Sequence, residues 1–396
     1  MSTNIILRPY QEEAVDFLAY QFRALVHSPA GSGKTVIGAA AVERHLDANP
    51  TDRVLWLCNT RDQQDQALRA LSDRGIVDPV TVKCVAGASL ADLEDVGLLV
   101  VDECHHAPAA TWWSLAQKAL DCEILIWGLT ATPWHYRDED RNDKVRELFG
   151  DRIFTVDREH LLKVNALVPA TVEMHDCLSE SVRFEIIERV NALMRGVGGS
   201  NTWREKRKRE ITYQVTRELI VADERRNNHI LTLASQAWED GRITLVLVGS
   251  IAHGRELCQK LGRDDAELLY AARGTRARRE VIDRFRLGQL PVLFATSLAD
   301  EGLDVPIASR MILTMGGRSP QKLEQRVGRV LRPFEGKDRG IIHDYLDTSA
   351  PMSYAQALAR VRLYRELGYE VHGLPTKDPA VRVPFDHAAF ANALKR

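Results

Sequence analysis

Residues 28–35 have the composition of a phosphate-binding loop. They read SPAGSGKT, follow the apolar residues ALV and precede an alanine-rich stretch that is typical of a helix. Gly31 and Gly33 would let backbone N–H groups turn toward a phosphate, and Lys34 would reach its oxygens. Ser28 stands where the usual pattern has a leading glycine. A glycine-rich turn that binds nothing is the alternative, which the strand–loop–helix context disfavours.

Two adjacent carboxylates end the apolar stretch VGLLVVDE at residues 96–103. Asp102 would hold Mg²⁺ together with the Thr35 hydroxyl, and Glu103 would orient or deprotonate an attacking water. Seen alone, such a pair could simply cap a strand as a solvated loop. Cys104, His105 and His106 follow at once, but nothing nearby completes a four-ligand zinc set. We expect His105 to couple this site to its neighbours.

Arginines recur at intervals of three in QRVGRVLR, residues 325–332. A helix would place Arg326, Arg329 and Arg332 along one stripe, and no nearby acidic run neutralises them. By itself this stripe would be a solvated basic face. The second half of the chain has no GKT loop of its own, so we expect this second core to complete the phosphate site of the first.

The elements that must position these residues alternate between strand and helix patterns. Residues 1–165 contain the apolar runs ALVHS, VLWLCN, VGLLVVDE and EILIWGLT, each followed by amphipathic sequence, and a similar alternation resumes from residue 243 to residue 345. Strands separated by helices predict parallel sheets. Between them lie an extended piece, PATVEMHDC, and charged helical sequence that GVGGSN interrupts. The predicted class is α/β with two parallel sheets in tandem and a helical segment embedded between them or within the second lobe.

Length and composition agree with two soluble cores. The 396 residues exceed the roughly 250–300 at which a single core stops growing, and 45% are hydrophobic and 27% charged. No apolar run is long enough for a membrane span, and the six cysteines lack paired spacing. We therefore expect a cytoplasmic protein without a membrane partner, and we expect it to be a monomer. Residues 1–170 carry 17 Lys and Arg against 25 Asp and Glu, which makes the remainder the basic half.

The predicted domains are 1–167, which binds the nucleotide; 168–240, a connecting strand and helices belonging to the second lobe; 241–348, the second α/β core; and 349–396, a helix and a proline-punctuated tail.

The order of these signatures resembles the superfamily-two helicases, within them the DExH group of type III restriction motors and UvsW- and XPB-like enzymes. The resemblance spans roughly residues 7–345 and adds LRPYQ near the start, TATP at 130–133 and ATSLADEGLDVP at 295–306. It implies two RecA-like lobes, ATP and Mg²⁺. It also implies a base contact from Gln11 and arginine fingers at Arg329 and Arg332.

The resemblance extends the set of site residues. Catalytic positions are then Lys34, Asp102, Glu103, Gln325, Arg329 and Arg332. Nucleotide-binding positions are Arg8, Gln11, Ser28, Gly31, Ser32, Gly33, Lys34, Thr35, Gly302 and Asp304. Coupling positions are His105, Thr130 and Thr132, and nucleic-acid positions are Arg61, Ser89, Ser250, Gly274, Thr275 and Thr296.

The predicted function is that of a nucleic-acid-stimulated ATPase, a helicase or translocase. By resemblance we expect movement from 3′ to 5′ and favour DNA, as a single strand or branched duplex. An RNA helicase and a non-unwinding duplex translocase or clamp, serving a larger complex as its motor subunit, are the alternatives. WREKRKR at 203–209 offers five bases beside an aromatic residue. It predicts either a stacking or strand-parting contact or a solvated helix face.

Overall fold

The computed structural model describes residues 6–134, 138–262, 266–296, 303, 305–317 and 319–375, without the side chains of residues 275 and 321. The chain divides into two compact units. The first contains residues 1–167 with the short segments 300–304 and 324–333, and the second contains residues 168–299, 305–323 and 334–396. No helix within the described ranges is long and apolar enough to cross a membrane.

The first unit is built on a parallel sheet. Among the described residues its strands are β1 (Arg23–His27), β2 (Arg53–Cys58), β3 (Val80–Cys84), β4 (Val96–Asp102), β5 (Leu125–Thr130) and β6 (Ile153–Thr155). They lie in the order β3-β2-β4-β5-β1-β6, and all neighbouring strands pair in parallel. The carboxyl ends of all these strands therefore meet at one edge of the sheet.

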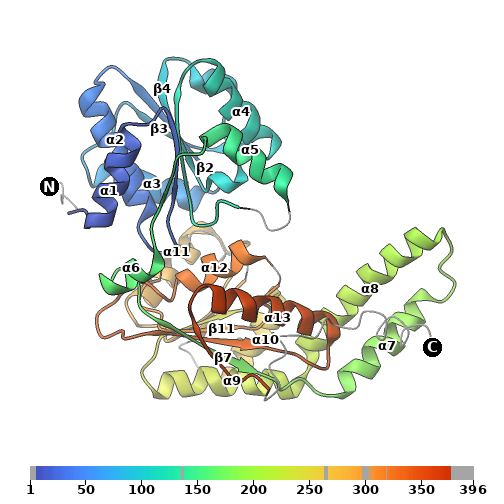
Figure 1. Ribbon diagram of the computed structural model, residues 1–396. Coiled ribbons are helices and arrows are strands. Elements are labelled where there is room, and N and C mark those ends of the chain that lie inside the picture. The colour runs from blue at the N-terminus through green and yellow to red at the C-terminus, as the bar shows by residue number, and fades with distance from the viewer. Residues whose placement is uncertain are drawn as a thin grey trace. The chain divides into compact units, whose positions relative to one another are not determined.

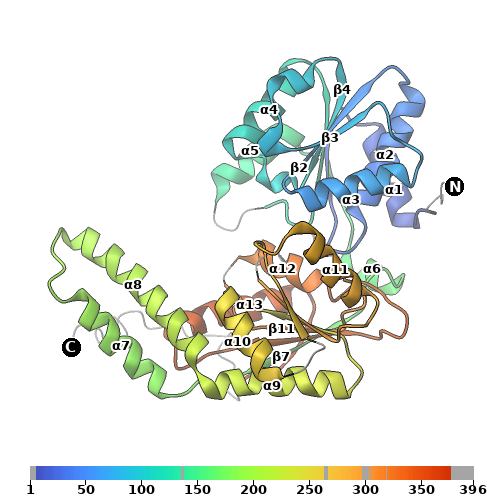
Figure 2. The same ribbon diagram turned by 180° about the vertical axis from the view of Figure 1, so that it is seen from behind.

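Helices cover both faces of this sheet (Figures 1 and 2). One face packs against α1 (Pro9–Ala19), α2 (Lys34–Ala48) and α3 (Arg61–Ser72), and the other against α4 (Ala110–Asp121) and α5 (Glu139–Phe149). In β2, Trp56 belongs to the first core and Leu55 to the second. Burial on both faces explains why the strands read as continuous apolar runs. The short helix α6 (Arg158–Lys163) follows β6.

The second unit repeats this design with its own parallel sheet. Its described strands are β7 (Ala170–His175), β8 (Thr244–Leu247), β9 (Ala266–Leu269), β10 (Val292–Ala295), β11 (Arg310–Leu313), β12 (Gly340–Tyr345) and β13 (Glu370–His372), in the order β13-β7-β12-β11-β8-β10-β9. The helices of this core are α9 (Glu224–Glu239), α10 (Ile251–Leu261), α11 (Thr275–Arg286), α12 (Pro320–Gly328) and α13 (Pro351–Glu366).

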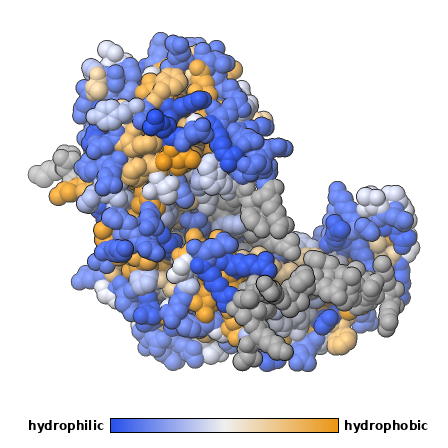
Figure 3. Space-filling model, in the orientation of Figure 1, coloured by the Kyte–Doolittle hydropathy of each residue, from blue (hydrophilic) through white to orange (hydrophobic). Residues whose placement is uncertain are grey.

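A helical hairpin projects from this second core (Figure 1). It consists of α7 (Ser181–Met194) and α8 (Asn201–Ala222), which pack through residues such as Ile186 and Val215. The predicted interruption GVGGSN forms the turn, and the Ser200 hydroxyl accepts a hydrogen bond from Trp203 N at 3.3 Å, which caps α8. The surface of the hairpin is predominantly hydrophilic (Figure 3).

The predicted α/β class, with two parallel sheets and a helical segment, is confirmed. Sequence patterns did not predict β3, β6 and β13. The expectation of one helical stripe of arginines is wrong, because α12 ends at Gly328 and only Arg326 of the three lies within it. Arg329 and Arg332 lie in the turns that follow.

Candidate nucleotide-binding site

The loop at residues 28–33 joins β1 to α2 at the carboxyl edge of the first sheet. Gly31 has φ +91° and Gly33 has φ +86°, conformations that side chains other than glycine rarely adopt. Lys34 Nζ donates to Ser28 O at 3.3 Å. The loop therefore has the backbone turn and the positioned cation that a phosphate cradle requires.

Ser28 accounts for the departure from the usual loop pattern. Its side chain is completely buried, and its Oγ donates to Ser32 Oγ at 2.5 Å. Its backbone N–H donates to Thr130 O at 3.0 Å, which ties the loop to the end of β5. A serine at this position thus closes the base of the loop from inside. Thr35, whose hydroxyl is the predicted metal ligand, lies half-buried in the first turn of α2.

The residues of LRPYQ pack directly on this loop. Tyr10 Oη donates to Ser32 O at 2.7 Å, and Gln11 Nε2 donates to the same oxygen at 3.2 Å. Gln11 Oε1 accepts from Arg8 N at 2.9 Å. A Cβ on Gly33 would lie 2.7 Å from Gln11 Nε2, so this glycine is needed for the close approach as well as for its φ. The predicted contact of Gln11 with a base stays a prediction.

The acidic pair Asp102 and Glu103 lies at the end of β4, and the pKa values of the two carboxyl groups are shifted in opposite directions. Burial and the charge of the neighbouring Glu103 together raise the pKa of Asp102 to about 7, although the charge of Lys34 opposes that rise. Burial acts upward on Glu103 as well, but the charge of Lys34 and the hydrogen bond with His105 outweigh it and lower its pKa to about 2. Two adjacent buried carboxylates with a nearby cation form an oxygen-rich site that suits a divalent cation. Asp102 fits a Mg²⁺ ligand in this respect, and the contribution of the Thr35 hydroxyl stays a prediction.

Glu103 and His105 meet a residue from the next strand. Thr130, at the end of β5, donates from Oγ1 to Glu103 Oε2 at 3.3 Å and bonds with His105 Nδ1 at 2.9 Å. His105 Nδ1 itself lies 3.4 Å from Glu103 Oε2. The Thr130 hydroxyl also accepts from Thr132 N at 3.2 Å. The structure thus brings the DECH and TATP signatures into one polar network beside the phosphate loop.

The arginine segment 324–333 groups with the first unit. Arg329 is 8% exposed, and its Nη1 donates to Leu303 O. Within this unit, a Cβ added at Gly31 would lie 3.3 Å from Arg332 Cγ, so the Arg332 side chain runs beside the phosphate loop. Gln325 lies half-buried on α12. These positions agree with the predicted roles without testing them.

Glu324 is a further candidate that the sequence patterns did not select. It is buried one residue before Gln325, and burial raises its pKa to about 7 while the charges of Lys34 and Arg158 oppose that rise. Tyr10 is a second residue whose contact with the loop only the structure reveals. The sequence signal for Glu324 is a carboxylate immediately before the basic segment QRVGRVLR.

The predicted nucleic-acid residues follow the carboxyl ends of strands in their own units. In the first unit Arg61 begins α3 after β2, and Ser89 follows β3 and bonds with Asp92 Oδ2 at 3.3 Å. In the second unit Ser250 follows β8 and caps α10 by accepting from His253 N at 3.2 Å. Gly274 follows β9 and Thr296 follows β10. Each residue is at an edge where backbone and small polar groups could meet phosphates.

Some predictions lie outside the described residues. Gly302 and Asp304 do, as does the side chain of Thr275, although its backbone begins α11. Within the described ranges no group of three or more His, Cys, Asp or Glu side chains could hold a metal ion by itself.

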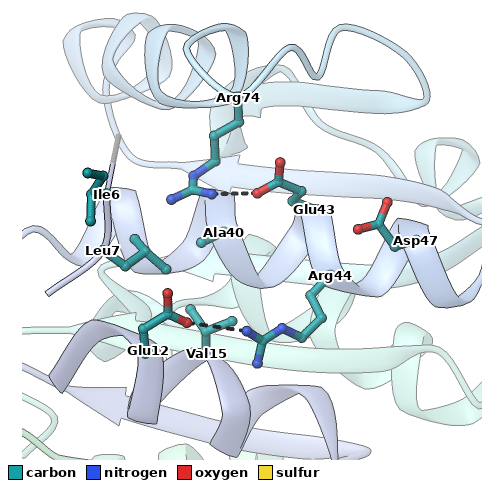
Figure 4. Close-up of a pocket in the computed structure, with 9 residues that line it drawn as sticks. All are labelled: Ile6, Leu7, Glu12, Val15, Ala40, Glu43, Arg44, Asp47 and Arg74. Atoms are coloured by element: carbon teal, nitrogen blue, oxygen red, sulfur yellow. Dashed lines mark hydrogen bonds and ion pairs between the residues drawn. The ribbon is translucent and has the colours of Figure 1, made fainter. Parts of the chain in front are cut away.

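A separate hollow of about 370 Å³ lies on the helical side of the first unit (Figure 4). Glu12 from α1, Glu43 and Arg44 from α2, and Arg74 just after α3 surround it. Arg44 pairs with Glu12 at 3.3 Å, and Arg74 pairs with Glu43. None of the predicted nucleotide-binding residues lines this hollow, so the candidate site rests on the carboxyl edge of the sheet.

Two family models match separate parts of the chain. A model described as type III restriction enzyme, res subunit, matches residues 4–85, and one described as helicase conserved C-terminal domain matches residues 225–333. The first match contains the phosphate loop and the second contains the arginine segment.

Curated relatives agree with these matches. A DNA 3′-5′ helicase XPB from Kineococcus radiotolerans is 27% identical over 353 residues, covering 83% of this chain and 57% of the relative. A DNA 3′-5′ helicase XPB from Mycobacterium tuberculosis is 25% identical over 390 residues, covering 92% and 64%. The chain spans about half the length of the first curated relatives it matches.

The fold is shared with solved structures. The Pyrococcus furiosus Hef helicase domain aligns with a TM-score of 0.57 at 17% identity, covering 88% of this chain and 98% of that domain. At this identity the likeness speaks for the fold alone, and it confirms the predicted tandem RecA-like lobes.

Proposed function

We propose that this chain is an ATP-dependent superfamily-two helicase, a DNA-stimulated ATPase that moves 3′ to 5′ along one strand. The two family matches and the curated relatives support this assignment. The observation that carries the proposal is the network of Glu103, His105 and Thr130 beside the phosphate loop. Through this network the carboxylate of Glu103 is hydrogen-bonded to Thr130 of the TATP motif. The XPB relatives are DNA 3′-5′ helicases, which supports the choice of DNA and of polarity.

In this proposal the phosphate loop holds the triphosphate of ATP. Backbone N–H groups around Gly31 and Gly33 and the Lys34 ammonium bind the phosphate oxygens, aided by the amino end of α2. Thr35 and Asp102 hold Mg²⁺, which when bound neutralises phosphate charge. The lowered pKa of Glu103 keeps its carboxylate charged and able to orient the attacking water.

Arg329 and Arg332 complete the site in the transition state. Fixed positive charge at the transferring phosphoryl group can contribute roughly 10³ to 10⁵ in rate. Gln325 contacts the γ-phosphate region, and Arg8 and Gln11 lie at the base. Hydrolysis then drives cycles of lobe closure and opening, and the strand moves with them.

The nucleic acid is held by polar groups at the carboxyl edges and by the α7–α8 hairpin. Arg61, Ser89, Ser250, Gly274 and Thr296 supply contacts that release easily. The hairpin adds an exposed Trp203, 50% accessible, and the bases of residues 204–209. No acidic residue occupies the first turn of α8. Basic side chains near the positive end of a helix repel it, and a bound polyanion relieves that repulsion.

The test compares ATP turnover with single-stranded DNA, duplex DNA and RNA. We expect the largest stimulation with single-stranded or branched DNA, and loss of turnover in Lys34→Ala. Displacement of a strand from a duplex with a 3′ tail, but not from one with a 5′ tail, would support the polarity. Preferential stimulation by RNA would favour an RNA helicase. Strong ATPase without displacement on any fork would favour a duplex translocase or clamp, and unchanged turnover in Lys34→Ala would contradict ATP hydrolysis at this site.

A further inference from the structure

A pair of buried arginines holds the loop that leads into α12. Residues 314–319 connect β11 to α12, which carries Gln325 and leads directly to Arg329. Arg360 comes from α13 and Arg226 from α9, and they are 6% and 1% exposed. Both arginines belong to the second unit, as does the loop.

Arg360 joins three elements through one guanidinium group. Its Nε and Nη2 donate to the two carboxylate oxygens of Asp344 on β12 at 2.7 and 2.8 Å. Its Nη1 donates to the backbone carbonyl of Gly317 at 3.0 Å. A Cβ on Gly316 would collide with the guanidinium, so the loop backbone lies directly on it. The planar guanidinium thus donates hydrogen bonds to a carboxylate on one side and to the loop backbone on the other.

Arg226 donates hydrogen bonds at the other end of the same loop. Its Nη2 donates to Thr314 O at 2.8 Å while Nε and Nη2 donate to Asp347 at 2.7 and 3.2 Å. Thr314 is further fixed to the end of β8, because its N–H and Oγ1 both donate to Leu247 O, at 3.0 and 2.9 Å. A small cavity of about 20 Å³ lies between the two arginines and the loop, room for about one water molecule.

Burying two arginines and two aspartates has a desolvation cost, and such groups are often no more stabilising than apolar residues of similar volume. The charged groups add direction here, because each arginine donates a hydrogen bond to a backbone carbonyl of the loop. The two carbonyls, Thr314 O and Gly317 O, lie in the loop that precedes α12 and the arginine segment.

We propose that Arg360 is a positioning residue for ATP hydrolysis, because it sets the conformation of the 314–319 loop and hence the placement of α12 and Arg329. Arg226 supports it from the other end of the loop. The inference rests on the proposed role of Arg329 as an arginine finger. A misplacement of about 1 Å in a catalytic group can lower a rate about 100-fold, so a small shift of this loop is enough.

The test is Arg360→Lys, which keeps a positive charge near Asp344 but cannot span both Asp344 and Gly317 O. The matched control is Tyr364→Phe, which removes the 2.8 Å hydrogen bond to Asp344 Oδ2 and leaves the loop contact intact. At saturating DNA, we expect Arg360→Lys to lower kcat about 10- to 100-fold with KM for ATP changed less than about threefold. We expect Tyr364→Phe to keep both constants within about twofold of the unmutated protein.

A second readout separates positioning from folding. Binding of ADP with aluminium fluoride, which mimics the transition state, should weaken in Arg360→Lys as it does in Arg329→Ala, while binding of ADP alone stays unchanged. Equal losses of kcat in Arg360→Lys and Tyr364→Phe, or normal binding of the mimic, would overturn the inference. If Arg360→Lys does not fold, Gly316→Ala decides, because its Cβ displaces the guanidinium from the loop. Normal kcat in that variant would overturn the inference equally.

The outcomes also separate this inference from the proposed function. Loss of kcat in Arg329→Ala with normal kcat in Arg360→Lys would remove only the positioning role. Absence of DNA-stimulated turnover in the unmutated protein, or its survival in Lys34→Ala, would remove the proposed function itself.

Discussion

Replacing Thr130 by valine tests the hydrogen-bond network of Glu103, His105 and Thr130 beside the phosphate loop. Valine has nearly the same shape as threonine, and the site is completely buried. The change removes the hydroxyl that bonds with Glu103 Oε2 at 3.3 Å and with His105 Nδ1 at 2.9 Å. The effect should therefore come from lost hydrogen bonds rather than from lost volume.

The magnitude follows from the charge of Glu103. A hydrogen bond to a charged group contributes about 1.5–3 kcal/mol, which corresponds to roughly a 10- to 150-fold change in rate if it acts wholly in the transition state. We expect kcat at saturating single-stranded DNA to fall within this range in Thr130→Val, with KM for ATP little changed. Strand displacement per ATP hydrolysed should fall further, because the Thr130 signature is the proposed link to movement.

The assay measures steady-state ATP turnover with and without DNA, together with strand displacement, in Thr130→Val and in the control Thr130→Ser. Serine keeps the hydroxyl and should keep most of the activity. Wild-type kcat and displacement in Thr130→Val would show that the Thr130 hydroxyl does not contribute to hydrolysis or to strand displacement. So would an equal loss in both variants, because the hydroxyl would then not be the group that matters.

Three other predictions concern separate parts of the chain. Gly33→Ala should weaken ATP binding roughly 5- to 30-fold, because φ +86° costs an alanine about 1–2 kcal/mol and its Cβ meets Gln11; unchanged ATP affinity by fluorescence titration would contradict the need for glycine. Burial, with the nearby charges of His175 and Arg310, lowers the pKa of His343 to about 3. Because this folded-state pKa lies below the unfolded value of about 6.5, the stability is complete above pH 6.5 and is lost as pH falls toward 3. Protonation of His343 should therefore lower the free energy of unfolding by about 2 kcal/mol between pH 7 and pH 5. Urea titrations at both pH values should show that His343→Gln removes this difference of about 2 kcal/mol. An unaltered pH dependence of stability in His343→Gln would contradict the prediction. Trp203→Ala should weaken single-stranded DNA binding by about 1–3 kcal/mol if the ring stacks on a base, while the control Phe184→Ala, which removes an exposed aromatic side chain from α7, should not; equal effects of the two would contradict stacking.

Much of the fold follows from local sequence patterns. Parallel strands buried on both faces must be continuously apolar, so β1, β2, β4 and β5 were readable as runs. The missed strands are short or partly exposed: β6 has three residues, as does β13. The end of α12 was also readable in principle, because Gly328 is a residue at which helices commonly stop.

The site was predictable in its residue types but not in its contacts. The sequence pattern placed Asp102 and Thr130 at strand ends and Lys34 at the start of the helix that follows a strand, and these positions meet at one edge of a parallel sheet. The hydrogen bond between Thr130 and Glu103 joins residues 27 apart in the chain, and that between Arg360 and Gly317 joins residues 43 apart. Such pairs depend on how strands and helices pack. Ser28 shows the same limit, since its bond to Ser32 Oγ explains the irregular loop only once the turn is folded.

The central claim is that Arg329 completes the ATP site that begins at the phosphate loop. The measurement is single-turnover ATP hydrolysis by Arg329→Ala at saturating DNA, with Arg326→Ala, three residues earlier on α12, as the control. We expect Arg329→Ala to bind ATP normally but to hydrolyse it at least about 1,000-fold more slowly. We expect Arg326→Ala to stay close to the unmutated rate. Hydrolysis by Arg329→Ala at the rate of the Arg326→Ala control would contradict the central claim.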